Sequence, residues 1–324
     1  FSLAALTVLE LSPPDMVEAA ARAGYSHVGL RLVPATEQER HFPLVADAEL
    51  RRQTQARLRD TGIKVLDLEI LRLEPATCVA DFEAILAVGA GLGGTELLVA
   101  GNDPDEARLT ERFAALCELA AQYGIHPHLE FMPWTDVRDL RQAMRVVANA
   151  DRVNGCVLVD AFHFNRSGSS LDDLAQLKPQ RMRYAQLCDV AGPVPADMDE
   201  ILRQARKERR FPGDGDADLV GLLRALPPSV PLSLEIPTRQ LLEQGISGEQ
   251  IPIAARMIVL AKVGESIWCL AGPELASADA SQRPLQLLHM RLMRQAQAPR
   301  RMQPDHHHQP CRRLRRDELT CQRL

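Results

Sequence analysis

The stretch from His126 to Asp160, HPHLEFMPWTDVRDLRQAMRVVANADRVNGCVLVD, holds two short apolar runs on either side of a helical pattern. The runs His126–Phe131 and Gly155–Asp160 each have the length of one buried strand, and the segment between them, Asp136–Ala148, predicts a helix. Strands joined by a helix run parallel, because the helix carries the chain back to the same edge of the sheet. The stretch therefore predicts one βαβ unit.

The same alternation continues along most of the chain. Further strands are predicted at Leu3–Leu9, His27–Leu32, Lys64–Leu71, Thr95–Ala100, Arg183–Cys188 and Pro231–Ile236. Further helices are predicted at Pro13–Ala23, Asp47–Thr61, Val79–Ala90, Glu106–Tyr123, Leu171–Leu177, Asp218–Leu226 and Ser247–Val263. Eight strands that alternate with eight helices predict a (β/α)8 barrel of the TIM type. An open doubly wound sheet is the alternative, but no G-x-G-x-x-G loop follows an early strand.

Composition and charge narrow the class of protein. The chain has 324 residues with 46% hydrophobic and 25% charged residues, which is ordinary for a globular protein. The net charge of −5 argues against binding of nucleic acid, and no apolar run is long enough to predict a membrane span. Seven cysteines without a C-x-x-C pair indicate a reduced, cytoplasmic protein.

The end of the chain has a different character. From about Gly264 the alternation of strands and helices stops, and Arg283–Leu324 is crowded with Arg, Gln and His. A block of this composition is typical of a solvated, poorly ordered tail. The sequence therefore predicts a catalytic barrel over residues 1–263 and an atypical tail over residues 264–324.

Oxygen-bearing side chains end four consecutive predicted strands. These residues are Glu130, Asp160, Gln186 and Glu235. In a barrel the C-terminal strand ends meet at one mouth, where catalytic groups lie. Three acids gathered there would repel one another, and a divalent cation would remove that repulsion. An all-oxygen set suits Mg²⁺ or Mn²⁺ better than Zn²⁺.

Other polar residues are candidates for contact with a substrate. His163 follows Asp160 by three residues and falls in the loop after its strand, whereas His128 is expected to fill the barrel interior below the site. Arg209 and Arg206 lie in the predicted long loop after the seventh strand, and an arginine there suits a carboxylate or phosphate. Weaker candidates to line the pocket are Arg31 and Glu69.

The ordered set of these motifs resembles the xylose isomerase-like barrel superfamily. The motifs are Leu129-Glu130, Val159-Asp160-x-x-His163, Gln186-Leu187-Cys188-Asp189, Arg209-Arg210-Phe211-Pro212-Gly213-Asp214-Gly215 and Leu234-Glu235, and the resemblance covers Ser2 to Val263. It implies four metal ligands, Glu130, Asp160, Gln186 and Glu235, with His163 contacting substrate and Arg209 gripping a substrate oxygen. Many isomerases and epimerases of that superfamily have His where this chain has Gln186. A Gln there resembles the 3-dehydroshikimate dehydratase branch.

The resemblance implies proton removal from a carbon next to a carbonyl, on a small sugar, sugar phosphate or hydroxy-keto acid. The first hypothesis is an isomerase or epimerase in which Glu130 and Glu235 remove and return the proton. The second is a lyase that expels a β-hydroxyl with His163 moving the proton. A metal-dependent endonuclease and a catalytically dead barrel are further alternatives. A homodimer is possible, and neither a nucleic acid nor a membrane is an expected partner.

Overall fold

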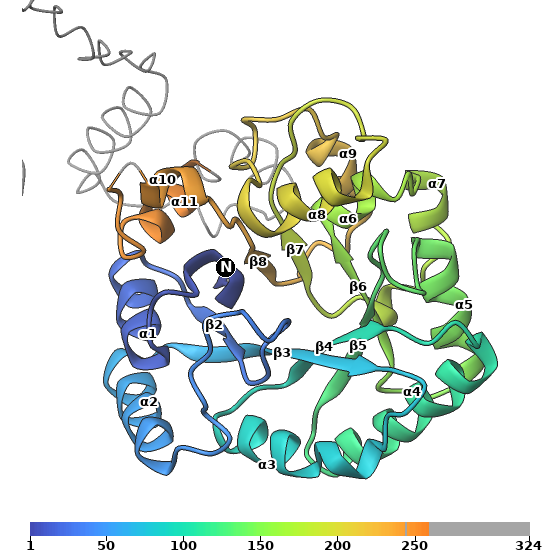
Figure 1. Ribbon diagram of the computed structural model, residues 1–324, viewed down its shortest axis with the longest axis horizontal. Helices are drawn as coiled ribbons and strands as arrows, with labels where there is room; N and C mark the ends of the chain where they lie inside the picture. Colours follow the sequence, from blue (N-terminus) through green and yellow to red (C-terminus); the bar gives the residue numbers. More distant parts are fainter. Residues whose placement is uncertain (244, 259–324) are drawn as a thin grey trace, which may run out of the picture.

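The strands of this protein form one closed parallel barrel, with helices around its outside (Figure 1). The computed structural model describes residues 1–243 and 245–258. The strands follow chain order, and β1 closes the barrel by pairing with both β2 and β8. Their bounds are β1 Ser2–Leu3, β2 His27–Arg31, β3 Lys64–Leu73, β4 Glu96–Gly101, β5 His126–Glu130, β6 Cys156–Asp160, β7 Ala185–Leu187 and β8 Leu232–Leu234. The predicted (β/α)8 barrel is confirmed.

The helices follow the predicted order. They are α1 Pro13–Arg22, α2 Ala48–Thr61, α3 Glu83–Gly91, α4 Glu106–Ala121, α5 Leu140–Ala150, α6 Ala161–Arg166, α7 Leu171–Leu174, α8 Met198–Lys207, α9 Leu219–Ala225, α10 Arg239–Glu243 and α11 Ile251–Ile258, with 3₁₀ turns η1 Ala5–Val8, η2 Val79–Phe82 and η3 Pro179–Arg181. Ser12 caps α1 by accepting from the Asp15 N–H, and Gly62 ends α2 at φ +74°. Among the described helices, none has the length and apolarity that a membrane crossing requires.

The first strand is shorter than the predicted Leu3–Leu9. β1 ends at Leu3, and the chain turns into η1. The Thr7 hydroxyl donates to the Leu234 carbonyl at 2.9 Å and accepts from the Ile236 N–H at 2.8 Å. This side chain bonds to the backbone at the end of β8, where a longer β1 would otherwise pair.

The predicted long loop after the seventh strand is wrong, because it contains helix α8. The segment is polar, and only Ile201 and Ala205, one helical turn apart, are buried. So weak an apolar stripe does not stand out in the sequence. Helix α6, which begins directly after β6, and the short α10 were also not predicted. Helix α5 begins after Asp139, whose side chain caps it, and not at the predicted Asp136.

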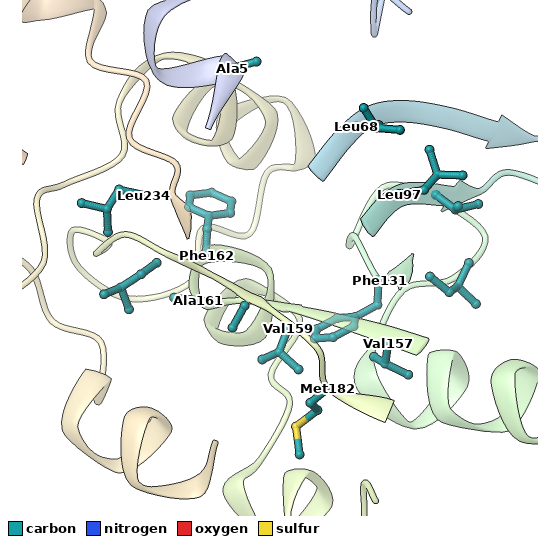
Figure 2. Close-up of a cluster of buried hydrophobic side chains, with 14 of the residues drawn as sticks. Ala5, Leu68, Leu97, Phe131, Val157, Val159, Ala161, Phe162, Met182 and Leu234 are labelled. Carbon is teal, nitrogen blue, oxygen red and sulfur yellow. The ribbon is translucent and has the colours of Figure 1, made fainter. Parts of the chain in front are cut away.

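Two apolar clusters hold the barrel. The larger lies between the strands and the helices, and Figure 2 shows part of it, with Leu68 from β3, Leu97 from β4 and Val157 from β6. The smaller fills the interior, with Leu66, Ile70, Leu98, Ala100, Met132, Leu158 and Tyr184. Away from the register shifts of β3, successive strand residues point to opposite faces, so the residues that alternate with the outer cluster belong to the interior. The polar side chains at the mouth continue this interior face.

Part of the C-terminal prediction falls outside the described residues. The last helix was predicted over Ser247–Val263, and the structure has α11 at Ile251–Ile258. Residues 259–263 lie outside the described residues. The tail predicted over residues 264–324 also lies outside it.

Candidate active site

The strand register gathers the four predicted metal ligands at the C-terminal mouth. Asp160 of β6 pairs with Gln186 of β7, and Gln186 pairs with Ser233 of β8, so their side chains share the interior face. Glu130 ends β5, and Glu235 comes one residue after β8, with its N–H bonded to the Leu187 carbonyl at 3.2 Å. All four side chains are buried. The interior face therefore carries a row of oxygen atoms from β5 to β8.

Arg209 joins two members of this row. Its Nη1 donates to Asp160 Oδ2 at 2.8 Å, and its Nη2 lies 2.8 Å from Glu235 Oε2. The Arg209 Nε donates to the Ala205 carbonyl at 2.9 Å, and the guanidinium lies over the Phe162 ring, 5.0 Å from its centre. These contacts hold a buried cation at the mouth, against two of the three acids.

His163 stands beside the remaining acid. The Asp160 side chain accepts from the His163 N–H at 2.9 Å and so caps α6, which fixes the histidine in the first turn. Its Nε2 lies 3.7 Å from Glu130 Oε1. Burial lowers the pKa of His163 to about 3, so the ring is neutral at physiological pH. The edge of Trp134 packs against the ring, with the two centres 5.0 Å apart.

The acids are incompletely neutralised by protein groups. Burial raises the pKa of Glu130, and the charges of Asp160 and Glu235 raise it further. Burial also raises the pKa of Glu235 to about 7, although Arg209 opposes the shift. Both shifts arise mainly from burial, so a further positive charge in the pocket would stabilise the ionised acids.

The donor set fits a divalent cation in its chemistry. Among the described residues, Glu130 Oε1 and Gln186 Oε1 are buried without a hydrogen-bond partner, and the other members are carboxylates. Gln186 Nε2 donates to Glu235 Oε1 at 3.3 Å, which turns the amide oxygen away from that carboxylate. In the described part of the chain, no three His, Cys, Asp or Glu side chains form a preassembled metal cluster, and the Arg209 guanidinium lies between two of the acids.

The weaker candidates from β2 and β3 also lie near this site. Arg31 pairs with Glu69 in register, and its Nη2 lies 3.2 Å from Glu69 Oε2. Arg31 lies within electrostatic reach of Glu235 and Glu130 as well. Both members of the pair are largely buried. They close the side of the mouth opposite β6 and β7.

Arg206 is placed differently from the prediction. It lies near the end of helix α8 and not in a loop, and its side chain is exposed. His128 lies in the barrel interior as predicted, with Nε2 2.8 Å from Glu96 Oε2. It belongs to a buried cluster at the opposite end of the strands from the mouth.

Asp189 organises the loop that follows Arg209, and the sequence reasoning did not single it out. Its carboxylate accepts backbone N–H groups of Val190, Gly213, Gly215 and Ala217 at 2.8–3.1 Å. A Cβ at Gly215 would lie 2.2 Å from the Val190 carbonyl, so only glycine fits there. The signal was an acid two residues after the end of β7, followed along the chain by a Pro-Gly-Asp-Gly turn.

The protein is thus a (β/α)8 barrel whose polar side chains gather at the C-terminal ends of the strands, where the active sites of such barrels lie. The chain belongs to the xylose isomerase-like TIM barrel family, whose model matches residues 17–258. The family named from the motifs is thus confirmed.

Two curated relatives resemble part of the chain. It is 30% identical over 136 residues to 3-dehydroshikimate dehydratase of Pseudomonas aeruginosa, a match that covers 41% of this chain and 21% of the relative. It is 31% identical over 114 residues to inosose isomerase of Bacillus subtilis, covering 34% of this chain and 38% of the relative. The matches thus span well under half the length of either relative.

A solved structure of similar fold is that of the IolI protein with a bound zinc atom. The TM-score is 0.67 at 20% sequence identity, and the match covers 82% of this chain and 98% of the other. At this identity the likeness concerns the fold.

Proposed function

We propose that this protein is a divalent-metal-dependent isomerase or epimerase acting on a small polyhydroxylated ketone. One observation carries the proposal: the carboxylates Glu130 and Glu235 lie at the two ends of the oxygen row, with Asp160 and Gln186 between them. Two carboxylates that face one substrate can remove a proton and return it at a different position. The partial likeness to inosose isomerase supports the proposal.

Glu130, Asp160, Gln186 and Glu235 would hold the metal ion, with Mg²⁺ or Mn²⁺ matching an oxygen shell. A divalent ion bound there supplies Lewis acidity that polarises the substrate carbonyl and makes the neighbouring C–H more acidic. The side chains of the protein carry out the proton transfers and bind the substrate.

One carboxylate takes the proton from the carbon next to the carbonyl, and the other delivers a proton to the product. His163 is neutral and lies beside Glu130, so it can donate to or accept from a substrate hydroxyl without carrying charge into the pocket. Arg209 and Arg31 offer guanidinium groups to substrate oxygens, and Glu69 fixes the orientation of Arg31.

A dehydratase of the 3-dehydroshikimate type is the second candidate, and Gln186 favours it. The resemblance places Gln at this position in that branch, and one relative carries that name. In this reaction a carboxylate removes the carbon proton, the C–O bond to the β-hydroxyl breaks, and His163 relays a proton from the carboxylic acid of Glu130 to the departing hydroxide, which leaves as water. Both candidates need the same first step.

The first step can be tested directly. The Mg²⁺- or Mn²⁺-loaded protein is incubated in D₂O with inosose or with 3-dehydroshikimate, and NMR follows deuterium at the carbon next to the carbonyl. We expect exchange that chelator removes and metal restores, with an isomerised ketone for the first candidate or an aromatic product absorbing in the ultraviolet for the second. Glu235→Gln should abolish exchange while the fold is retained. Exchange that persists in that variant would contradict the role of Glu235.

A further inference from the structure

Arg72 lies on the same interior row as Glu130, although no role follows for it from the motifs. In the strand register Arg72 of β3 pairs with Ala100 of β4, and Ala100 pairs with Glu130 of β5. Side chains in such a row point to the same face, and the Ala100 methyl is too small to separate its neighbours. With strands about 4.8 Å apart, the Arg72 and Glu130 backbones are ~10 Å apart. A small substrate at the mouth can reach both side chains.

In the part of the chain that the structure describes, the hydrogen-bond acceptors of Arg72 are neutral. Its Nη1 donates to Asn102 Oδ1 at 3.2 Å, and its Nη2 donates to the Ala35 carbonyl at 3.3 Å. Within residues 1–243 and 245–258 it forms no ion pair, and the acids Glu130 and Glu74 act on it only at longer range. Arg31 and Arg209 differ, because each already faces carboxylates of the protein.

Positive charge accumulates around Arg72. Burial lowers the pKa of Arg72, and the nearby charges of Arg31 and Arg206 lower it further. Arg206 is exposed near the end of α8. A guanidinium with two like charges nearby, and with no directly paired acid among the described residues, gains from a bound anion.

Arg72 is also open to a ligand. Its side chain is half-buried and lines a cavity of about 340 Å³ together with Ile70, Glu74 and Thr77. This volume falls in the range of small-molecule sites. Ile70 belongs to the interior cluster, whereas Leu71 belongs to the outer cluster, so the cavity lies beside the end of β3 at the wall of the barrel.

We infer that Arg72, with Arg206 nearby, binds an anionic group of the substrate, either a carboxylate or a phosphoryl group, while the oxygen row acts on its carbonyl end. This assignment rests on the proposed function, since it concerns the substrate of the same site. It selects hydroxy-keto acids and sugar phosphates over neutral ketoses. A neutral substrate would leave the Arg72 charge without a counter-ion.

Binding of matched ligand pairs tests the assignment without requiring turnover. Calorimetric titration compares shikimate with its neutral methyl ester and D-fructose 6-phosphate with D-fructose, on metal-loaded wild type, Arg72→Met and the control Arg141→Met. Arg141 is exposed and pairs with Asp173, and the two belong to the outer helices α5 and α7. We expect wild type to prefer the charged member of one pair by about 10- to 100-fold, the usual worth of a charge-assisted contact. The pair that shows the preference identifies the anion.

Arg72→Met should lose that preference and leave the affinity for the neutral member unchanged, whereas Arg141→Met should behave as wild type. Circular dichroism and metal content verify that each variant is folded and loaded. Equal affinity of wild type for both members of each pair, or equal weakening of both by Arg72→Met, overturns the assignment. A preference that depends on Arg72, in a protein that exchanges no substrate deuterium, would support the anion site and count against the proposed reaction. If instead the wild type exchanges substrate deuterium and Arg72→Met leaves the preference for the charged ligand unchanged, the proposed reaction would be supported and the anion site would be overturned.

Discussion

The guanidinium of Arg209 donates to the carboxylate of Asp160 at 2.8 Å, and both side chains are buried. The bond ties the loop after α8 to the end of β6, two segments far apart in sequence. The same guanidinium reaches Glu235 on the other side. A loop residue is thereby held against the oxygen row by two acids of that row.

Replacement of Arg209 should destabilise the protein, because it leaves buried acids without their cation. We expect Arg209→Met to lower the free energy of unfolding by about 3 kcal/mol, the cost of breaking a buried ion pair. Urea denaturation at pH 7 measures this, with Arg141→Met as the exposed control. An exposed pair such as Arg141 with Asp173 should contribute less than about 1 kcal/mol. Equal stability of the two variants would contradict the structural role of Arg209.

Replacement of His163 should affect turnover much more than stability. We expect His163→Ala to lower kcat by about 100-fold, as loss of an acid–base group usually does. Metal content should stay unchanged, since His163 is not among the proposed ligands. His163→Gln retains hydrogen bonding without proton transfer and should be nearly as impaired. Steady-state kinetics and metal analysis on the same preparations check both points, and a kcat close to that of wild type would remove His163 from the proton path.

The barrel and the oxygen row could be predicted because both depend on local patterns. Strands buried on both faces form short apolar runs, and an acid at the end of such a run stands out. Glu130, Asp160, Gln186 and Glu235 all follow from this pattern. Their convergence is then a property of the fold, since parallel strands bring their C-terminal ends to one mouth.

The contacts that cross the mouth could not be predicted in this way. Arg72 was missed because β3 was expected to end at Leu71, whereas it continues to Leu73 and pairs with β4 beyond a register shift between Leu68 and Leu71. A register shift changes which residues face inward, and the sequence pattern alone does not locate it. Arg209 and Asp189 were visible as residues, but their side chains bond to groups far away in the sequence.

Asp189 should matter for catalysis through the position of the Arg209 loop. Asp189→Asn keeps the size of the side chain but removes the charge that attracts the N–H groups of Gly213 and Gly215. We expect kcat/KM to fall by about 10-fold or more, with metal affinity largely unchanged. Limited proteolysis should detect earlier cleavage near residues 211–217. The exposed Asp199→Asn serves as control. Loss of activity without any change in the cleavage pattern would show that Asp189 acts in another way.

The cluster at the other end of the barrel should make stability depend on pH. Glu96 is buried, and burial alone would raise its pKa, but the hydrogen bond from His128 and the pairing with Arg183 outweigh this and lower the pKa of Glu96 to about 2. Burial lowers the pKa of His128, so this ring is neutral near neutral pH. Arg183 is then the cation of the cluster. A depressed carboxyl pKa stabilises the fold above the ordinary pKa of about 4.5, and that stabilisation disappears as the pH falls towards 2.

At one pKa unit per 1.4 kcal/mol, Glu96 should contribute up to about 3 kcal/mol to the free energy of unfolding at pH 7, and this part is lost between about pH 5 and pH 2. His128 acts in the same direction, because the unfolded chain binds a proton below about pH 6.5 that the buried ring resists. Urea denaturation from pH 7 to pH 3 should therefore show a steeper loss for wild type than for Glu96→Gln, which starts less stable. His128→Gln, which retains a donor for Glu96, should flatten the curve between pH 6.5 and 5 while leaving the lower part in place. Parallel curves for wild type and Glu96→Gln would show that this cluster does not set the acid sensitivity of the barrel.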